Sequence, residues 1–155
     1  MLRQSPCLLA ALFASCGLVH DWRELQTEPM AIGTCFDGIE HCARGMKFVS
    51  DDSVTDRGLG IGQSRWRQRV KPPVGKPTRY RLRVEILVDD GSPQAGWPLR
   101  FVVDQEVVDN LRKATSPEEG DWSSDGQDRE IESIYGEALR RRLAPRSDTL
   151  APPRS

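Results

Sequence analysis

The 155-residue chain has no long apolar run, and it is poor in the residues that catalysis commonly uses. No stretch approaches the roughly 18 consecutive apolar residues that a membrane-spanning helix needs. Only two histidines are present, His20 and His41, and no Gly-x-Ser-x-Gly nucleophile motif occurs. His41 and Cys42 are adjacent in sequence, and a histidine in that position does not normally direct its ring nitrogen at the neighbouring thiol, as a catalytic base must. We therefore expect no membrane-spanning helix and no enzymatic activity.

Paired short cysteine spacings, which structural zinc sites use, are also missing. The chain has four cysteines, and five residues separate Cys35 from His41. The glycine-rich segment 58–62 lacks the third glycine of a phosphate-binding loop and a following Gly-Lys-Ser or Gly-Lys-Thr. These absences argue against a zinc centre and against a nucleotide phosphate site, and we expect no bound cofactor other than the calcium considered below.

The charge that is present is segregated along the chain, although the net charge is only −1. Nine basic residues and no acid lie between Arg57 and Arg83, whereas thirteen acids and four bases lie between Val84 and Glu132. Such asymmetry favours a charged partner, or pairing of the two segments with each other.

The basic segment is our candidate polyanion-binding site. Arg65, Arg67, Arg69 and Lys71 alternate with other residues, so in an extended chain they project to one side and could follow a phosphate backbone. Aromatic side chains in the segment could stack on bases. The candidate residues are Arg65, Trp66, Arg67, Arg69, Lys71, Arg79, Arg81 and Arg83. The alternatives are a solvated strand face and intramolecular pairing with the acidic segment.

The N-terminal segment 1–22 suggests a second possibility, which is export. An arginine at position 3 precedes an apolar run, and the sequence FASCG ending at Gly17 resembles the bacterial lipobox, in which Cys16 would be lipidated. The alternatives are a buried N-terminal helix, or a true start at Met30 or Met46. If the protein is exported, Cys35 and Cys42 would pair as a disulfide; in the cytoplasm they would be thiols.

The ordered part is predicted to be a small α+β domain over residues 79–143. Alternating apolar residues predict a strand over residues 80–88, and a second strand begins at Leu99. Asp104 is placed as the N-cap of a helix that ends near Ala114, and a second helix runs from Asp128 to Leu143. We expect a β-hairpin packed by two helices, a loosely structured arm over residues 23–78, and a disordered tail over residues 144–155.

The segment 121–132 resembles an EF-hand-type calcium loop. Oxygen ligands fall at the first, third and fifth loop positions, a glycine follows, and an acid stands at position twelve. The ligands would be Asp121, Ser123, Asp125 and Glu132. An acidic loop that caps the following helix explains the same residues, since no helix leads into Asp121 and a cation occupies position nine.

The sequence favours a small non-enzymatic interaction protein whose arginine-rich segment contacts an acidic partner: a nucleic acid, an anionic surface or an acidic protein. A cytoplasmic location fits this function. The alternative is an exported, lipid-anchored bacterial envelope protein, with or without the calcium loop. No family resemblance covers the ordered region, so function rests on the residues alone.

Overall fold

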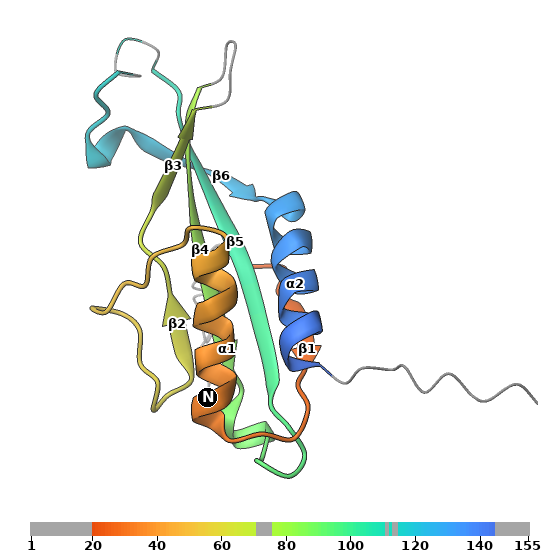
Figure 1. The fold of residues 1–155 in the computed structure, drawn as a ribbon. Coiled ribbons are helices and arrows are strands. Elements are labelled where there is room, and N and C mark those ends of the chain that lie inside the picture. The colour runs from red at the N-terminus through yellow and green to blue at the C-terminus, as the bar shows by residue number, and fades with distance from the viewer. Residues whose placement is uncertain (1–19, 71–75, 111, 113–114, 145–155) are drawn as a thin grey trace, which may run out of the picture.

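The computed structural model describes residues 20–70, 76–110, 112 and 115–144, and Figure 1 shows its fold. Within these residues six antiparallel strands form one sheet and two α-helices pack on it, which confirms the expected α+β class. The strands are β1 (Arg23–Gln26), β2 (Ile61–Gln63), β3 (Arg67–Val70), β4 (Pro77–Ile86), β5 (Pro98–Val108) and β6 (Trp122–Gln127). The helices are α1 (Ile32–Gly45) and α2 (Arg129–Leu143), and short 3-10 turns span Val88–Asp90 and Glu119–Asp121.

The long hairpin of β4 and β5 is the centre of the sheet. The predicted alternation holds on β4, where Leu82, Val84 and Ile86 are buried on one face. Their cross-strand partners on β5, among them Leu99 and Phe101, are buried on the same face. Because directly opposed residues of an antiparallel pair project to the same side, these rows form one continuous apolar surface.

The shorter strands pair with the two outer edges of this hairpin. Strands β2 and β3 both pair with β4, while β1 and β6 both pair with β5. Each edge of the sheet is therefore built from two short strands placed end to end along one long strand (Figure 1).

Both helices cover the same, apolar face of the sheet. Gly62 on β2 lies against Phe36 of α1, and the Phe101 ring on β5 meets Tyr135 of α2 edge-on at a centroid distance of 5.4 Å. Helix α2 begins as predicted, because the Asp128 carboxylate accepts a hydrogen bond from the backbone N–H of Ile131. The opposite face of the sheet is covered by neither helix.

The helix expected to follow Asp104 is not formed. Strand β5 continues through Val108, and Asp104 stands opposite Arg81 of β4. Short apolar runs fit both helical and strand periods, so the valines near residue 107 did not distinguish them. The long antiparallel pairing of β5 with β4 and its pairing with β6 stabilise these residues as a strand.

Part of the segment that sequence reasoning left loosely structured is ordered. Helix α1 places Cys35, Phe36, Ile39 and Cys42 in the main apolar core, and β1, β2 and β3 belong to the sheet. Cys16, the predicted lipidation site, residues 71–75 of the predicted arm and the tail after Ala144 lie outside the described residues, and the predictions made for them stay predictions.

Candidate functional site

The sheet face opposite the helices carries three of the four tryptophans, interleaved with arginines. Residues Arg79, Arg81 and Arg83 alternate on β4 with the buried apolar positions and therefore project to this side. We call this surface the tryptophan–arginine face. It consists of Trp22, Trp66, Trp122, Arg79, Arg81, Arg83 and Arg100, together with the acidic residues that pair with these arginines.

At one end of this face the Arg79 guanidinium contacts two indole rings. Its central carbon lies 4.5 Å from the Trp66 ring centroid and 4.6 Å from that of Trp122. Arg81 also lies over Trp66, at 4.4 Å. These distances are within the range of cation–π attraction. Trp66 directly precedes β3, Arg79 and Arg81 belong to β4, and Trp122 belongs to β6, so the cluster joins the two edges of the sheet across its open side.

At the other end the aromatic partner comes from the segment before β1. Arg100 on β5 lies over the Trp22 ring at 4.7 Å, and the His20 ring is 5.5 Å from that of Trp22. His20 Nε2 also lies 2.8 Å from a carboxylate oxygen of Asp104. The segment before β1 is thus held on this face by both stacking and a polar contact.

Most arginines of the face are bound to carboxylates of the same chain. Arg79 donates to both carboxylate oxygens of Glu119 at 2.8 and 2.6 Å, and to Glu106 at 2.6 Å. Arg81 pairs with Asp104 at 3.2 Å. The remaining pair joins Arg100 to Glu85 at 2.6 Å. The Arg79–Glu119 contact, with two N–H donors on the two carboxylate oxygens, has the strong geometry for arginine and carboxylate.

The hydrogen bonds between Arg79 and its carboxylate partners shift the pKa values of Arg79 and Glu119. Burial works to lower the pKa of Arg79, but the hydrogen bonds to Glu119 and Glu106 outweigh it, so the pKa is raised. The hydrogen bonds from Arg79 in turn lower the pKa of Glu119. Both charges are therefore more strongly favoured in the folded protein than in isolation.

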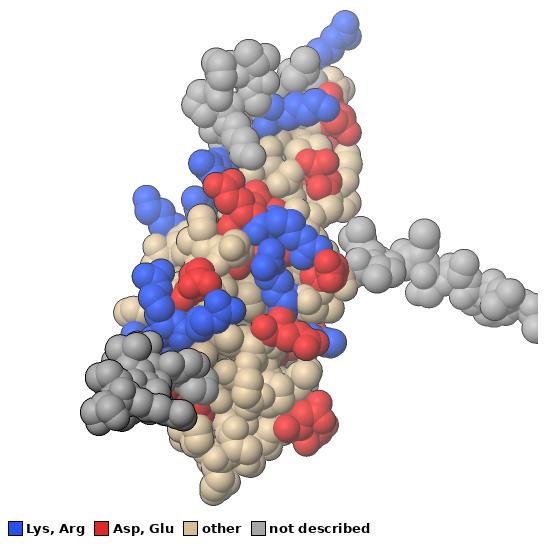
Figure 2. Space-filling model, turned by 90° about the vertical axis from the view of Figure 1, so that its right-hand side faces the viewer, with Lys and Arg blue, Asp and Glu red and all other residues tan. Residues whose placement is uncertain are grey.

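These pairs account for the charge segregation of the sequence. The basic strand β4 lies antiparallel to the acidic strand β5, and Lys76 adds a pair with Asp109 at 2.6 Å. Figure 2 shows basic and acidic side chains lying beside one another over one side of the molecule, rather than in separate patches. The alternative of intramolecular pairing is thus realised for much of the basic segment.

The predicted polyanion-binding residues do not form one surface. Arg67 and Arg69 are opposite Tyr80 and Thr78 in the register, so they lie on the helix-bearing side, away from Arg79, Arg81 and Arg83. The Arg67 guanidinium donates to the Met46 carbonyl and lies over the Phe48 ring at 5.7 Å.

The other members of the predicted set differ in their surroundings. Arg65 is exposed, and Trp66 belongs to the tryptophan–arginine face. Lys71 is outside the described residues. Arg83 is half-buried on the tryptophan–arginine face and forms no ion pair with any other described residue. Binding to a polyanion remains a prediction.

The segment resembling a calcium loop is divided among three elements: Asp121 ends a 3-10 turn, residues 122–127 form strand β6, and residues 129–132 begin α2. Ser123 and Ser124 pair with Val107 and Glu106 of β5, so the backbone is extended where the predicted loop would curve around an ion. The Asp125 carboxylate accepts a hydrogen bond from the Gln105 side chain. Among the described residues, no group of three or more His, Cys, Asp or Glu side chains converges as a metal site would require.

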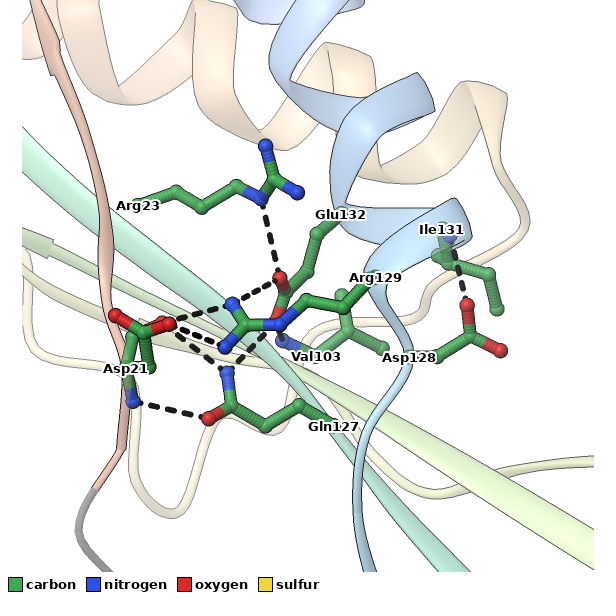
Figure 3. A network of polar contacts seen from close by, with 8 residues as sticks. All are labelled: Asp21, Arg23, Val103, Gln127, Asp128, Arg129, Ile131 and Glu132. Carbon is green, nitrogen blue, oxygen red and sulfur yellow. Dashed lines mark hydrogen bonds and ion pairs between the residues drawn. The ribbon is translucent and has the colours of Figure 1, made fainter.

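Glu132, the last predicted ligand, is fully buried and already satisfied (Figure 3). Its carboxylate accepts hydrogen bonds from the Val103 backbone N–H at 3.1 Å and from Gln127 at 2.9 Å. It also accepts from Arg129 at 2.9 Å and from Arg23 at 3.2 Å. A buried carboxylate with this many donors is a structural anchor, because each lone pair that is withdrawn from water has a replacement.

Cys35 and Cys42 are thiols and do not form the conditional disulfide. Seven residues apart on one helix, they are separated by about 10.5 Å of helical rise, beyond the reach of a disulfide. Burial raises the pKa of Cys35 to about 11 and also raises the pKa of Cys42, against the nearby Arg142 and Arg141. Both thiols are therefore poor nucleophiles.

Comparison of the sequence with protein-family models and with curated proteins finds no match. None of the helices in the described part of the chain is long and apolar enough to cross a membrane. The tryptophan–arginine face was not predicted, since its tryptophans lie far apart in the sequence and belong to no local motif. The alternation of Arg79, Arg81 and Arg83 was the one signal for it.

Proposed function

We propose that the chain is a non-enzymatic binding protein that docks an acidic partner protein on the tryptophan–arginine face. The observation that supports this is the contrast between Arg83 and its neighbours. Arg79, Arg81 and Arg100 each hold a carboxylate of this chain, whereas Arg83, between them, holds none among the described residues. A carboxylate from a partner would complete the row.

The surroundings of Arg83 suit a protein partner. The residue opposite it on β5 is Val102, which carries no charge, and Trp22 and Trp66 on the same face are half-buried. Tryptophan and arginine are the side chains most enriched in binding hot spots, where apolar contact excludes water around a small number of polar bonds. An acidic side chain bound at Arg83 would lie in such surroundings.

A nucleic acid fits this face less well. Phosphate backbones are bound by releasing counterions at several free cations. On this face the charges of Arg79, Arg81 and Arg100 are already neutralised by Glu119, Glu106, Asp104 and Glu85. A polynucleotide would have to displace these carboxylates, whereas a protein needs only one well-placed acid at Arg83.

The test uses a fluorescein-labelled oligoglutamate peptide and a single-stranded DNA of equal length, with Arg83→Glu and Arg69→Glu as matched variants. Both arginines lack an ion pair among the described residues, and they lie on opposite faces of the sheet. We expect Arg83→Glu to weaken peptide binding by about tenfold and Arg69→Glu to leave it within about twofold.

Three results would overturn this function. The first is no saturable peptide binding at low salt. The second is equal weakening by Arg69→Glu, which would place the contact on the helix-bearing side. The third is tighter binding of the DNA that also depends on Arg83, which would make the partner a nucleic acid. Circular dichroism of both variants establishes that each is folded.

A further inference from the structure

Helix α2 carries an exposed stripe of residues on the side that faces away from the sheet. The stripe consists of Glu130, Ile134, Glu137 and Arg141. At about 100° of rotation per residue these four fall within an arc of about 60°, opposite the buried side chains of Tyr135 and Leu139. Their alternating spacings of four and three residues are those of the seam along which two helices of a coiled coil pack.

The centre of the stripe is apolar. Ile134 is 52% exposed, and among the described residues it is the one large apolar side chain that either helix exposes. The other exposed large apolar side chains, Val49, Val54 and Leu59, lie in the segment between α1 and β2. The half-buried Ala138 beside the stripe is small, so another helix can approach this surface closely.

The two ends of the stripe carry opposite charges. Glu130 lies in the first turn of α2 and Arg141 in the last, and neither forms an ion pair with another described residue. The Nε of Arg141 donates to the Glu137 carbonyl, which leaves its terminal nitrogens for a partner. The charge of Glu137 is offset by Arg140 at 2.7 Å. The helix dipole favours an acid first and a base last, but it does not place them on the same arc as Ile134.

We propose that this stripe is the contact between two copies of this chain, in which the two α2 helices pack antiparallel about a twofold axis. The axis passes between Ile134 and Glu137, so the two Ile134 side chains meet beside it. At 1.5 Å of rise per residue, Glu130 and Arg141 each lie about 8 Å from the axis, on opposite sides of it. Glu130 of one copy therefore faces Arg141 of the other, and this pair occurs twice. A parallel arrangement would oppose like charges, so charge complementarity selects the antiparallel one.

The tryptophan–arginine face stays open in this dimer, because it lies on the side of the sheet that the helices do not cover. The two copies of that face point away from each other, and the dimer presents two docking surfaces. Arg83 takes no part in the helix contact, so dimerisation and docking can each fail without the other. Because one helix pair buries less surface than a stable dimer usually does, we expect a dissociation constant of roughly 10 to 100 µM.

The first test is sedimentation equilibrium of the full chain at low salt and with a reductant, using Ile134→Gln and Leu59→Gln as matched variants. Both substitutions remove an exposed apolar side chain, but Leu59 lies outside the stripe. We expect the wild type to dimerise and Ile134→Gln to weaken the dimer at least about tenfold. Leu59→Gln should leave the dissociation constant within about twofold of the wild type.

The second test uses Glu130→Arg and Arg141→Glu, alone and mixed. Each substitution opposes like charges in its own dimer, so each variant alone should dimerise at least about tenfold more weakly than the wild type. In an equimolar mixture the two different chains face each other with opposite charges at both sites. Mixed dimers should therefore form about as tightly as the wild-type dimer. A loss of helix stability in either variant cannot produce this recovery.

Three results would overturn the proposal. The first is a wild-type chain that stays monomeric up to about 1 mM. The second is a Leu59→Gln variant that is weakened as much as Ile134→Gln, which would place the contact elsewhere. The third is a mixture of the two charge variants that associates no better than its components, which would exclude the antiparallel arrangement. Circular dichroism of each variant establishes that it is folded.

Discussion

Arg81 on β4 stands directly opposite Asp104 on β5, and their side chains form an ion pair of 3.2 Å on the open face of the sheet. The same carboxylate lies 2.8 Å from the His20 ring, so Asp104 connects the central hairpin to the segment before β1. Asp104 is itself buried, with 8% of its surface exposed. The Asp104 carboxylate therefore contacts side chains from two distant parts of the chain, Arg81 on β4 and His20 before β1.

We expect Asp104→Ala to lower the free energy of unfolding by about 2 to 4 kcal/mol, because it leaves a half-buried guanidinium without its partner. The matched control is Asp109→Ala, which removes an exposed pair with Lys76 and is expected to leave the free energy of unfolding nearly unchanged. Urea denaturation at pH 7 measures both. Equal effects of the two substitutions would contradict the structural role of Asp104.

The contact between Arg79 and Glu119 makes stability depend on pH. The pKa of Glu119 is lowered in the folded protein by hydrogen bonds from Arg79. Its contribution is therefore fully present above the unfolded value of about 4.3 and is lost as the pH falls through the folded value. Because Glu119 is largely exposed, we expect Glu119→Gln to cost no more than about 1 kcal/mol at pH 7.

That difference between Glu119→Gln and the wild type should shrink as the pH falls below the unfolded pKa of Glu119 and vanish once the pH is below its lowered folded pKa. It should also shrink in 1 M salt, which screens exposed charges over about 3 Å. Chemical denaturation at a series of pH values measures the difference. A difference that does not change with pH would show that the carboxylate charge of Glu119 does not contribute.

Two glycines with the same positive φ separate the cost of the backbone conformation from the cost of a steric clash. Gly96 and Gly126 both have a φ of 81°, but a Cβ at Gly96 would lie 2.2 Å from the Thr27 carbonyl oxygen, whereas at Gly126 nothing lies within 4 Å. We expect Gly126→Ala to cost about 1 to 2 kcal/mol from the left-handed conformation alone. Gly96→Ala should cost about 1 to 3 kcal/mol more. Thermal denaturation of the two variants compares them, and equal losses would exclude the close approach at Thr27.

The thiols of α1 are expected to be unreactive until the protein unfolds. In a Cys7→Ser/Cys16→Ser background, Cys35 and Cys42 should react with a thiol-specific reagent at pH 8 at least about 100-fold more slowly than in denaturant. A mild oxidant should leave the mass of the folded chain unchanged, because the two thiols lie about two helical turns apart. A loss of 2 Da from the folded monomer, about one disulfide, would contradict the placement of both on α1.

The elements that sequence reasoning predicted are those with a local signal. Helix α2 has a capping aspartate, an apolar stripe and three arginines in its last turn, and strand β4 and the start of β5 alternate between apolar and other residues. Helix α1 was missed, because its apolar stripe is interrupted by Gly33 and Gly38 and its N-cap Ala31 makes no side-chain capping bond.

The candidate sites depend on pairings that no local pattern contains. Asp104 and Glu119 become partners of Arg81 and Arg79 only once the register of the long hairpin and the position of the 3-10 turn are fixed. Because Asp often caps helices, the sequence favours a helix N-cap at Asp104. In the structure its carboxylate instead forms a cross-strand ion pair with Arg81. Burial of Glu132 likewise follows from the docking of α2 on β5, which spacing alone does not specify.

The anchor at Glu132 links the stability of the first residues of the sheet to that of the last helix. Arg23 and Glu132 are 109 positions apart, and Asp21 binds Arg129 across a similar span. These contacts between the start and the end of the domain form only after most of the chain is folded. They therefore favour slow folding and a single cooperative transition. A chain that begins at residue 24 would lack Arg23 and would deprive the buried Glu132 carboxylate of a donor, so the shortest stable version of this domain must retain the first residue of β1.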